Sequence, residues 1–226
     1  MKLFLSRVLL PCLVFSSATF VRAETPAPAR EMNGMPLVFS EDFEKGRDRW
    51  EVTDEKSWTH RTVDGNAVFG INRRESDYQP VHRSPLHIAL IKEVALTDFV
   101  LTFKVRSTKD TGGHRDCCII FNHQNPSNFY YAHLGAKPDP ASGQIMIVQN
   151  APRRPITENK KPVPWTAGWH QVKVVRDSAK GTIEVFFDNM ETPQLSAVDN
   201  TFGKGRIGLG SFDDMNDFDE VRLYGK

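Results

Sequence analysis

One stretch of this sequence, His114 to Gly135, concentrates side chains that could do chemistry. It reads as two β-strands joined by a polar loop over residues 124–128. Three of the seven histidines of the chain lie in it. It also holds several other polar side chains: Arg115, Asp116, Tyr130 and Tyr131. Such groups hydrogen-bond to polar ligands and stack on them, and histidine moves protons near neutral pH. A strand pair that only filled a core would not need them, so this stretch is the predicted functional region.

Strand alternation divides the second half of this stretch between two faces. If Tyr130 and Leu134 face the core, Tyr131 and His133 share the opposite face. There they could act on a ligand as acid and base, and Arg115 could clamp or neutralise a carboxylate. The candidate catalytic residues are therefore His133, Tyr131 and Arg115.

Further candidate ligand-binding residues lie in this stretch and in two segments that could form the rim of the same cleft. They are His114, Asp116, His123, His82, Arg83, Asn150 and Arg153. His82 and Arg83 belong to a proline-bounded turn, and Asn150 and Arg153 follow a strand, which is where binding residues concentrate. The alternative is that Arg115 and Asp116 form an ordinary surface ion pair and that the histidines are solvated edge residues.

The elements that would position these residues are all strands. Eleven segments rich in Val, Ile, Phe and Tyr are separated by Gly, Pro, Asn and Asp turns, and no amphipathic helix is evident. The predicted strands cover residues 37–43, 67–71, 86–91, 99–107, 117–123, 129–134, 144–149, 170–176, 182–188, 206–210 and 218–224. This spacing predicts an all-β fold, an antiparallel two-sheet sandwich.

The N-terminus has the pattern of a secretory signal peptide. Lys2 and Arg7 precede an apolar run from Val8 to Phe20, and Val21 and Ala23 are small residues before the expected cleavage point. The predicted organisation is a signal peptide over residues 1–23, a flexible leader over 24–36 and one domain over 37–226. The expected location is secreted or periplasmic.

Composition narrows the class of partner. Removal of residues 1–23 takes away three basic side chains and no acidic one, which leaves 26 basic against 28 acidic side chains, a net charge of −2. This balance, without a basic block, argues against nucleic acid as a partner. No other apolar run reaches the ~20 residues of a membrane span. The adjacent Cys117 and Cys118 would point to opposite faces of a strand, so we expect two small buried thiols without a disulfide. A monomer is expected.

Four segments occur in the order found in one superfamily. They are Phe39-Ser-Glu-Asp-Phe-Glu44, Gly168-Trp-His-Gln-Val-Lys-Val174, Gly181-Thr-Ile-Glu-Val-Phe-Phe-Asp188 and Phe218-Asp-Glu-Val-Arg-Leu223. Over residues 37–226 the chain resembles the concanavalin A-like lectin/glucanase jelly rolls, and among them the secreted bacterial 3-keto-disaccharide hydrolase-like domains. The resemblance implies a jelly roll whose concave face binds or hydrolyses a glycan or disaccharide. The alternatives are a non-catalytic carbohydrate-binding domain and a structural or adhesive envelope domain.

Acidic residues gather at both ends of the predicted domain, around Asp42 and over residues 213–220. First and last strands are neighbours in such a sandwich, so the two groups could converge. Oxygen ligands without Cys or His suit Ca²⁺, and the resemblance also implies a structural calcium near this strand pair. Asp42 and Asp219 are the predicted ligands.

Overall fold

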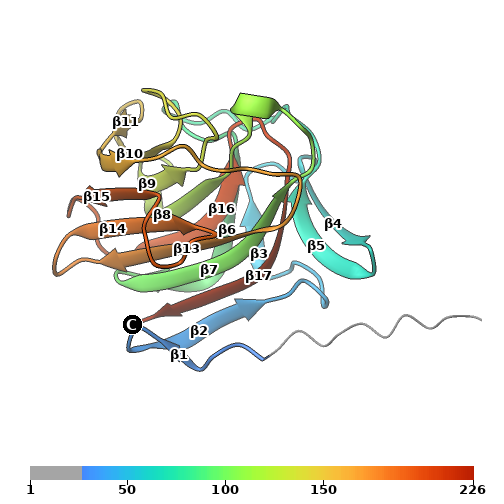
Figure 1. The fold of residues 1–226 in the computed structure, drawn as a ribbon, viewed down its shortest axis with the longest axis horizontal. Coiled ribbons are helices and arrows are strands. Elements are labelled where there is room, and N and C mark those ends of the chain that lie inside the picture. Colours follow the sequence, from blue (N-terminus) through green and yellow to red (C-terminus); the bar gives the residue numbers. More distant parts are fainter. Residues whose placement is uncertain (1–26) are drawn as a thin grey trace, which may run out of the picture.

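A computed structural model describes residues 27–226, so the predicted signal peptide lies outside the described residues. The model is a sandwich of two antiparallel sheets, with loops gathered at one end of it (Figure 1). Within residues 27–226, no helix is long and apolar enough to cross a membrane. The prediction of an all-β two-sheet sandwich is confirmed.

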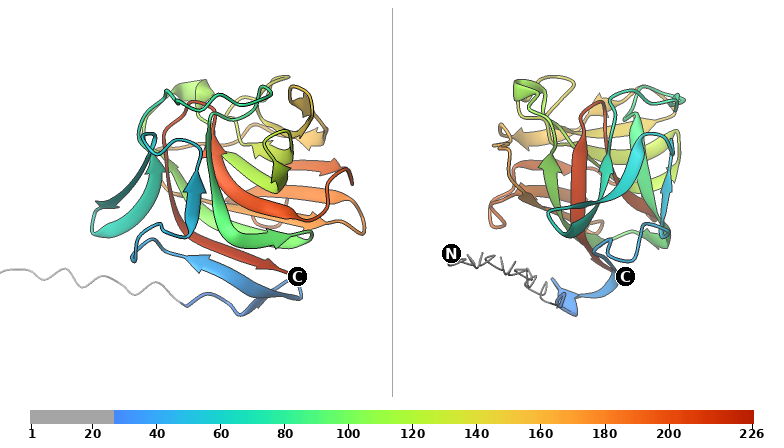
Figure 2. Two further views of the ribbon diagram at one scale, coloured as in Figure 1. Left: turned by 180° about the vertical axis from the view of Figure 1, so that it is seen from behind. Right: turned by 90° about the vertical axis from the view of Figure 1, so that its right-hand side faces the viewer.

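The first sheet has ten strands. They are β1 (Glu31–Met32), β2 (Met35–Glu41), β17 (Asn216–Gly225), β7 (Phe99–Ser107), β13 (His170–Asp177), β14 (Thr182–Phe187), β15 (Leu195–Val198) and β12 (Thr157–Lys160), with β5 (Asn66–Ile71) pairing β17, and β4 (Trp58–Val63) pairing β5. Figures 1 and 2 show the β4–β5 hairpin projecting at one side of the sandwich.

The second sheet has seven strands. In spatial order they are β11 (Arg154–Pro155), β10 (Gln144–Gln149), β9 (Asn128–His133), β8 (Cys118–Asn125), β16 (Gly205–Ser211), β6 (His87–Leu96) and β3 (Trp50–Val52). A short 3₁₀ turn, η1 (Gly112–His114), precedes β8. It lies at the same end of the molecule as the long segment between β5 and β6 (Figure 2).

All eleven predicted strands are present, with ends shifted by a few residues. The loop predicted over residues 124–128 is tighter, because β8 extends to Asn125 and β9 begins at Asn128. Strand pairing also starts inside the predicted leader. There Asn33 and Gly34, with φ of 52° and 71°, form the turn between β1 and β2. An Asn-Gly pair adopts these left-handed angles readily, and it closes a two-residue hairpin.

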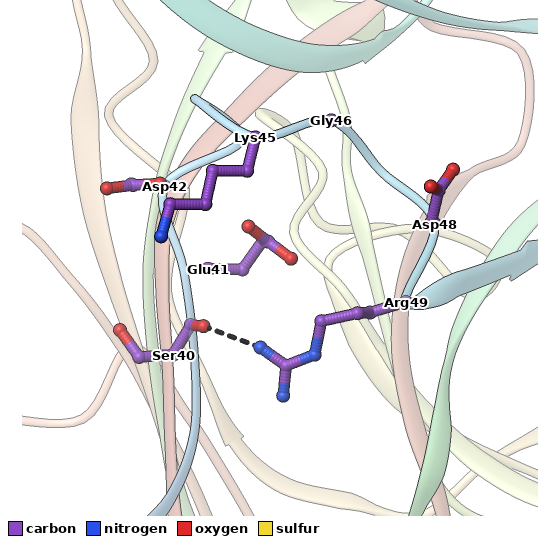
Figure 3. A pocket seen from close by; sticks show the side chains of 7 residues that line it. All are labelled: Ser40, Glu41, Asp42, Lys45, Gly46, Asp48 and Arg49. Carbon is purple, nitrogen blue, oxygen red and sulfur yellow. Dashed lines mark hydrogen bonds between the residues drawn. The ribbon is translucent and has the colours of Figure 1, made fainter.

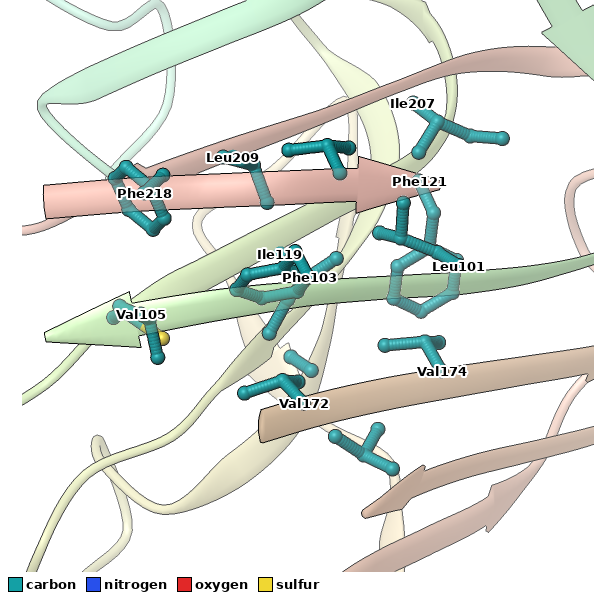
Figure 4. Packing of buried hydrophobic residues seen from close by; sticks show 14 of the residues in the cluster. Leu101, Phe103, Val105, Ile119, Phe121, Val172, Val174, Ile207, Leu209 and Phe218 are labelled. Atoms are coloured by element: carbon teal, nitrogen blue, oxygen red, sulfur yellow. The ribbon is translucent and has the colours of Figure 1, made fainter. Parts of the chain in front are cut away.

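The main core lies between the two sheets. Inward side chains of β7 and β13, such as Leu101, Phe103 and Val172, meet Ile119 and Leu209 from the second sheet (Figure 4). In β7 buried and partly buried positions alternate over Leu101–Ser107, as the period of two in a strand requires. Apolar area removed from water, at ~25 cal/mol per Å², is the main favourable term for this packing.

A second, smaller apolar layer lies on the outer face of the seven-stranded sheet. It joins Ile88, Cys118, Tyr131 and Met146, and Phe212 packs on it. This confirms the predicted strand parity, because the neighbouring Tyr130 belongs to the main core. A sheet that is apolar on both faces must be covered on both. The loops that cover this outer layer are therefore the ones that shape the candidate site.

The two chain ends of the domain are neighbours, as predicted. β2 pairs antiparallel with β17, with Glu41 opposite Val221. Cys117 and Cys118 are fully buried, as predicted, and burial raises the pKa of both thiols.

Candidate functional site

A cleft of about 1060 Å³ opens over the outer face of the seven-stranded sheet. Its walls come from the segments before β6 and β8, from the segment between β9 and β10, and from the turn after β16. They are lined by Arg74, Gln79, Pro80, Arg83, Ser84, Leu86, Gly113, His114, Asp116, His133, Lys137, Asp139, Ala141, Ser142, Arg153, Phe212 and Asp213. Twelve of these 17 residues are polar or charged, so the cleft offers many hydrogen-bonding side chains to a ligand.

The wall formed by residues 72–86 is held by the buried carboxylate of Asp54. It accepts hydrogen bonds from the Ser57 hydroxyl at 2.7 Å, from the Arg73 guanidinium at 2.7 Å and from the Asp77 backbone N–H at 2.8 Å. Hydrogen bonding by these donors, led by Ser57, holds the pKa of Asp54 well below its usual range. A long segment without secondary structure is thereby fixed in position.

Arg153 joins the cleft to the apolar layer beneath it. Its guanidinium carbon lies 4.1 Å from the centre of the Phe212 ring, a cation–π contact. Its Nη1 donates a hydrogen bond to the Tyr131 hydroxyl at 3.2 Å, and its backbone N–H donates to the carbonyl of Arg83 at 3.2 Å. Arg83 and Arg153, from distant segments, therefore meet at one wall.

Asp116 and His133 form the inner wall of the cleft, and both are buried. Asp116 Oδ1 accepts a hydrogen bond from the Ser211 hydroxyl at 2.9 Å and lies 3.5 Å from His133 Nε2. His133 Nδ1 lies 3.1 Å from the carbonyl oxygen of Ala141. A carbonyl only accepts, so Nδ1 carries the hydrogen of this bond.

Asp214 supports this wall from below. One of its carboxylate oxygens accepts the Asp116 backbone N–H at 3.1 Å, and the Thr111 hydroxyl donates to the other at 3.0 Å. Burial raises the pKa of Asp214 to about 6, and the negative charge of Asp116 adds to that shift. Asp214 positions the backbone of Asp116 and does not line the cleft itself.

The cleft brings together five of the predicted site residues: Arg83, His114, Asp116, His133 and Arg153. Tyr131 lies beneath it and is 0% exposed, so its ring is not a platform on which a ligand could stack. Burial also raises the pKa of the Tyr131 hydroxyl. The sequence placed Tyr131 on the correct face but could not show that loops cover that face.

Four other predicted residues lie outside the cleft. Arg115 is buried at 8% exposure and pairs with Asp110 at 3.1 Å, so it is not the expected clamp on the rim. His82 is half-buried in the loop next to Arg83. His123 and Asn150 lie at the opposite end of the β8–β9 hairpin, where His123 packs against the Phe129 ring at 5.2 Å.

Asp42 and Asp219 line different pockets, so the structure does not bring the two predicted calcium ligands to one site. Figure 3 shows that the carboxylates of Glu41, Asp42 and Asp48 point in different directions. Asp219 accepts a hydrogen bond from Asn66 at 2.9 Å. The nearby Asp217 is paired with Arg61 and Arg106, at 2.5 Å and 2.9 Å. Calcium binding by Asp42 and Asp219 stays a prediction.

The sequence reasoning missed several cleft residues, among them Arg74, Lys137, Phe212 and Asp213. Asp213 was grouped with the acidic residues of the predicted calcium site, but it accepts two hydrogen bonds from Arg74, at 2.5 Å and 3.0 Å. The Gly- and Pro-rich segment around Lys137 carried a loop signal only. Nothing in the spacing of these residues indicates that their loops converge.

No family model and no curated protein matches this chain in sequence. Among solved structures it is similar to a carbohydrate-binding module, CBM66 from Bacillus subtilis, at 17% identity and a TM-score of 0.55, covering 78% of this chain and 96% of that one. It is also similar to domain 4 of AbnA, a GH43 extracellular arabinanase from Geobacillus stearothermophilus solved with arabinotriose. There the identity is 11% and the TM-score 0.52, covering 84% and 92% of the two chains.

A third similar structure is the GH43 protein BlXynB from Bacillus licheniformis, in a K247S mutant. The identity is 12% and the TM-score 0.57, covering 83% of this chain but only 39% of that one. At such identities the likeness shows the fold alone, a two-sheet jelly-roll sandwich consistent with the concanavalin A-like type that the sequence resembles. The finer resemblance to 3-keto-disaccharide hydrolase-like domains stays a prediction.

Proposed function

We propose that this protein binds carbohydrate in the cleft over the seven-stranded sheet. The observation that carries the proposal is the cleft itself: about 1060 Å³, with 12 polar or charged residues among the 17 that line it, on a sheet face covered by loops. Its volume lies just above the ~300–1,000 Å³ typical of small-molecule sites. The same fold serves a carbohydrate-binding module and a domain solved with arabinotriose, which supports a sugar as the ligand.

Four basic side chains and three acidic ones line the cleft, and this slight positive excess favours an acidic sugar. Arg74 is engaged by Asp213, whereas the exposed Arg83 and Lys137 reach the cleft without an ion-pair partner among the described residues. Phe212, the only aromatic residue in the cleft lining apart from histidine, is already faced by the Arg153 guanidinium. Recognition would therefore depend on hydrogen bonds and on a carboxylate clamp more than on ring stacking.

A glycan array of neutral and uronate-containing oligosaccharides, probed with the chain from Glu24 onward, tests this proposal. We expect binding to a subset that is enriched in uronates and an affinity that falls with added salt. A reducing-sugar assay on the same glycans runs in parallel. If neither binding nor turnover is found, both carbohydrate functions are wrong, and a structural or adhesive envelope domain becomes the better reading.

Cleavage of the bound sugar is the second candidate, favoured by one observation. The buried His133 Nε2 lies 3.5 Å from Asp116 Oδ1 at the wall of the cleft, which gives an acid/base pair within reach of a ligand. If the protein is an enzyme, His133→Gln should abolish product release while glycan binding persists. Arg115 and Tyr131 would not contact the sugar directly.

Export and calcium complete the proposal. Residues 1–23 support a secreted or periplasmic location, so the exported protein should begin at Glu24 when its N-terminus is sequenced. For calcium, we expect Ca²⁺ to raise the melting temperature and the calcium-selective chelator EGTA to reverse the change. An unchanged melting temperature would remove Asp42 and Asp219 as ligands.

A further inference from the structure

Three side chains that are common metal ligands meet beneath the cleft. The ligand atoms of Asp116, Cys118 and His133 all lie within 4.8 Å of one another, and the three residues are buried. Over residues 27–226 no other group of three or more His, Cys, Asp or Glu side chains has this arrangement. None of the carbohydrate chemistry proposed above uses Cys118.

The hairpin geometry places all three on one face. Asp116 and Cys118 are two residues apart in an extended segment, so their side chains point the same way. Cys118 is the direct antiparallel partner of His133 in the register of β8 and β9. The backbone N–H of Leu134 bonds to the Cys117 carbonyl at 2.8 Å, which continues the pairing beyond β8. Cys118 and His133 therefore lie on paired strands, and Asp116 lies in the segment that leads into β8.

Among residues 27–226, His133 Nε2 has no hydrogen-bond partner, although it is buried. Because Nδ1 donates to the Ala141 carbonyl, Nε2 of the neutral ring presents a lone pair. It faces Asp116 Oδ1 at 3.5 Å, and an ionised carboxylate is also only an acceptor. Two buried acceptors that face each other require a cation between them, either a proton or a metal ion.

We propose that Asp116, Cys118 and His133 bind a transition-metal cation of the Zn²⁺ class. A thiolate, an imidazole and a carboxylate are ligand types of zinc, whereas Ca²⁺ and Mg²⁺ take oxygen ligands. On binding, the Cys118 thiol gives its proton to solvent. With bonds of about 2.0 Å to N and O and about 2.3 Å to S, tetrahedral ligands lie roughly 3.3–3.5 Å apart. Ligand atoms that lie up to 4.8 Å apart would therefore close by roughly 1.5 Å at most.

The surroundings supply the second layer of contacts that such a site needs. The Ala141 carbonyl orients the His133 ring, and the Ser211 hydroxyl donates to Asp116. Asp116 and His133 line the cleft, whereas Cys118 lies under it. A fourth ligand, which a tetrahedral ion takes, would then come from the cleft, as water or a ligand hydroxyl.

Cobalt titration of the metal-free protein, expressed from Glu24, tests the site directly. Co²⁺ bound by a thiolate absorbs in the near ultraviolet, and we expect this band to saturate at one equivalent and to disappear on addition of Zn²⁺. Cys118→Ser should abolish the band, and His133→Gln should weaken cobalt binding at least tenfold. Cys117→Ser is the matched control, because this equally buried neighbour faces the main core and should retain the band.

Circular dichroism and thermal unfolding of each metal-free variant establish that it is folded. X-ray absorption of the zinc-loaded wild type requires no variant and should show one sulfur at about 2.3 Å together with N/O ligands. Absence of stoichiometric cobalt uptake, a band that survives Cys118→Ser, or a zinc shell without sulfur would overturn the proposal. The cation between Asp116 and His133 would then be a proton. Glycan binding is measured separately, so either proposal can fail alone.

Discussion

The two ends of the β8–β9 hairpin carry similar polar residues, but these residues have different roles. At the cleft end, Asp116 and His133 are buried at 4% and 5% exposure under fixed loops. At the turn end, Asn125 and Asn128 are exposed or half-buried, and their amides serve the turn. The types of residue do not distinguish the two ends. The difference is that loops cover the cleft end and enclose its polar groups in a candidate site.

The turn end satisfies its own polar groups. Asn125 Oδ1 accepts hydrogen bonds from the Ser127 backbone N–H at 2.9 Å and from Asn128 Nδ2 at 3.1 Å. Asn128 Nδ2 also donates to Asn150 Oδ1 at 3.0 Å. These bonds close a tight turn, and local bonding of this kind is what Asn side chains commonly provide. A polar cluster whose bonds are all local is evidence for a turn and not for a ligand site.

The largest expected effect is at the cleft end. Tyr131→Ala removes a fully buried ring from the outer apolar layer and should lower the free energy of unfolding by about 3–5 kcal/mol. Tyr131→Phe keeps the ring and loses the bond from Arg153, so we expect a loss of only about 1–2 kcal/mol. Urea unfolding measures both. Equal stability of the alanine variant and the wild type would show that the cleft floor is not a packed layer.

Ligand affinity should fall when an arginine of the cleft wall is replaced. Arg83→Ala removes an exposed guanidinium that lines the cleft, and should weaken binding of the best array glycan by roughly 10- to 50-fold. His82→Ala is the control, because this neighbour does not line the cleft. Isothermal titration calorimetry compares the two variants. Equal losses in both variants would mean that the cleft is not the sugar site.

The fold could be predicted more completely than the site, because the sequence of each strand carries its own pattern of apolar and polar residues. In β7 and β13, apolar and polar residues alternate because one face of each strand is buried. This alternation can be recognised in the sequence without knowledge of the partner strand. The same parity correctly separated Tyr130 from Tyr131. The short strands β1, β3, β11, β12 and β15 were missed, since two to four residues carry too little pattern. The six-residue strand β4 was missed as well.

Site prediction failed where the outcome depended on loops. Arg115 was expected at the rim, but Asp110, five residues earlier, is close enough to pair with it. Asp213 was grouped with the acidic residues near the predicted calcium site, whereas its partner Arg74 lies 139 residues away in sequence. Cys118 was read as a small buried group, which is correct for its packing. Its position opposite His133 follows only from the strand register.

A smaller, pH-dependent effect is expected at the turn end. Burial, helped by the charge of Arg206, lowers the pKa of His123 to about 4, compared with 6.5 for a free histidine. The folded state therefore holds fewer protons than the unfolded state between these values. The contribution of the neutral His123 side chain to the stability of the folded state is complete above pH 6.5, and it is lost as the pH falls toward 4. The shift corresponds to about 3 kcal/mol at most, and partial exposure reduces this to roughly 1–2 kcal/mol.

His123→Gln tests the direction of this pH dependence, since it removes the titrating group and leaves the rest of the hairpin unchanged. Between pH 7 and pH 4.5 the wild type should lose about 1–2 kcal/mol more stability than the variant in urea unfolding. Glycan affinity at pH 7 should not differ between them. A variant that loses as much stability as the wild type would contradict the burial of a neutral His123.

The smallest effect is expected at Asn150, an exposed residue with a left-handed φ of 49°. Asn150→Gly loses the bond from Asn128 but relieves the backbone, so stability should stay within about 0.5 kcal/mol of the wild type. Asn150→Ala loses the same bond and keeps a Cβ in the left-handed region, so it should be less stable than the glycine variant by about 1 kcal/mol. Neither substitution should change glycan affinity. If both weaken binding while stability follows this order, Asn150 contacts the ligand, and the turn end belongs to the site after all.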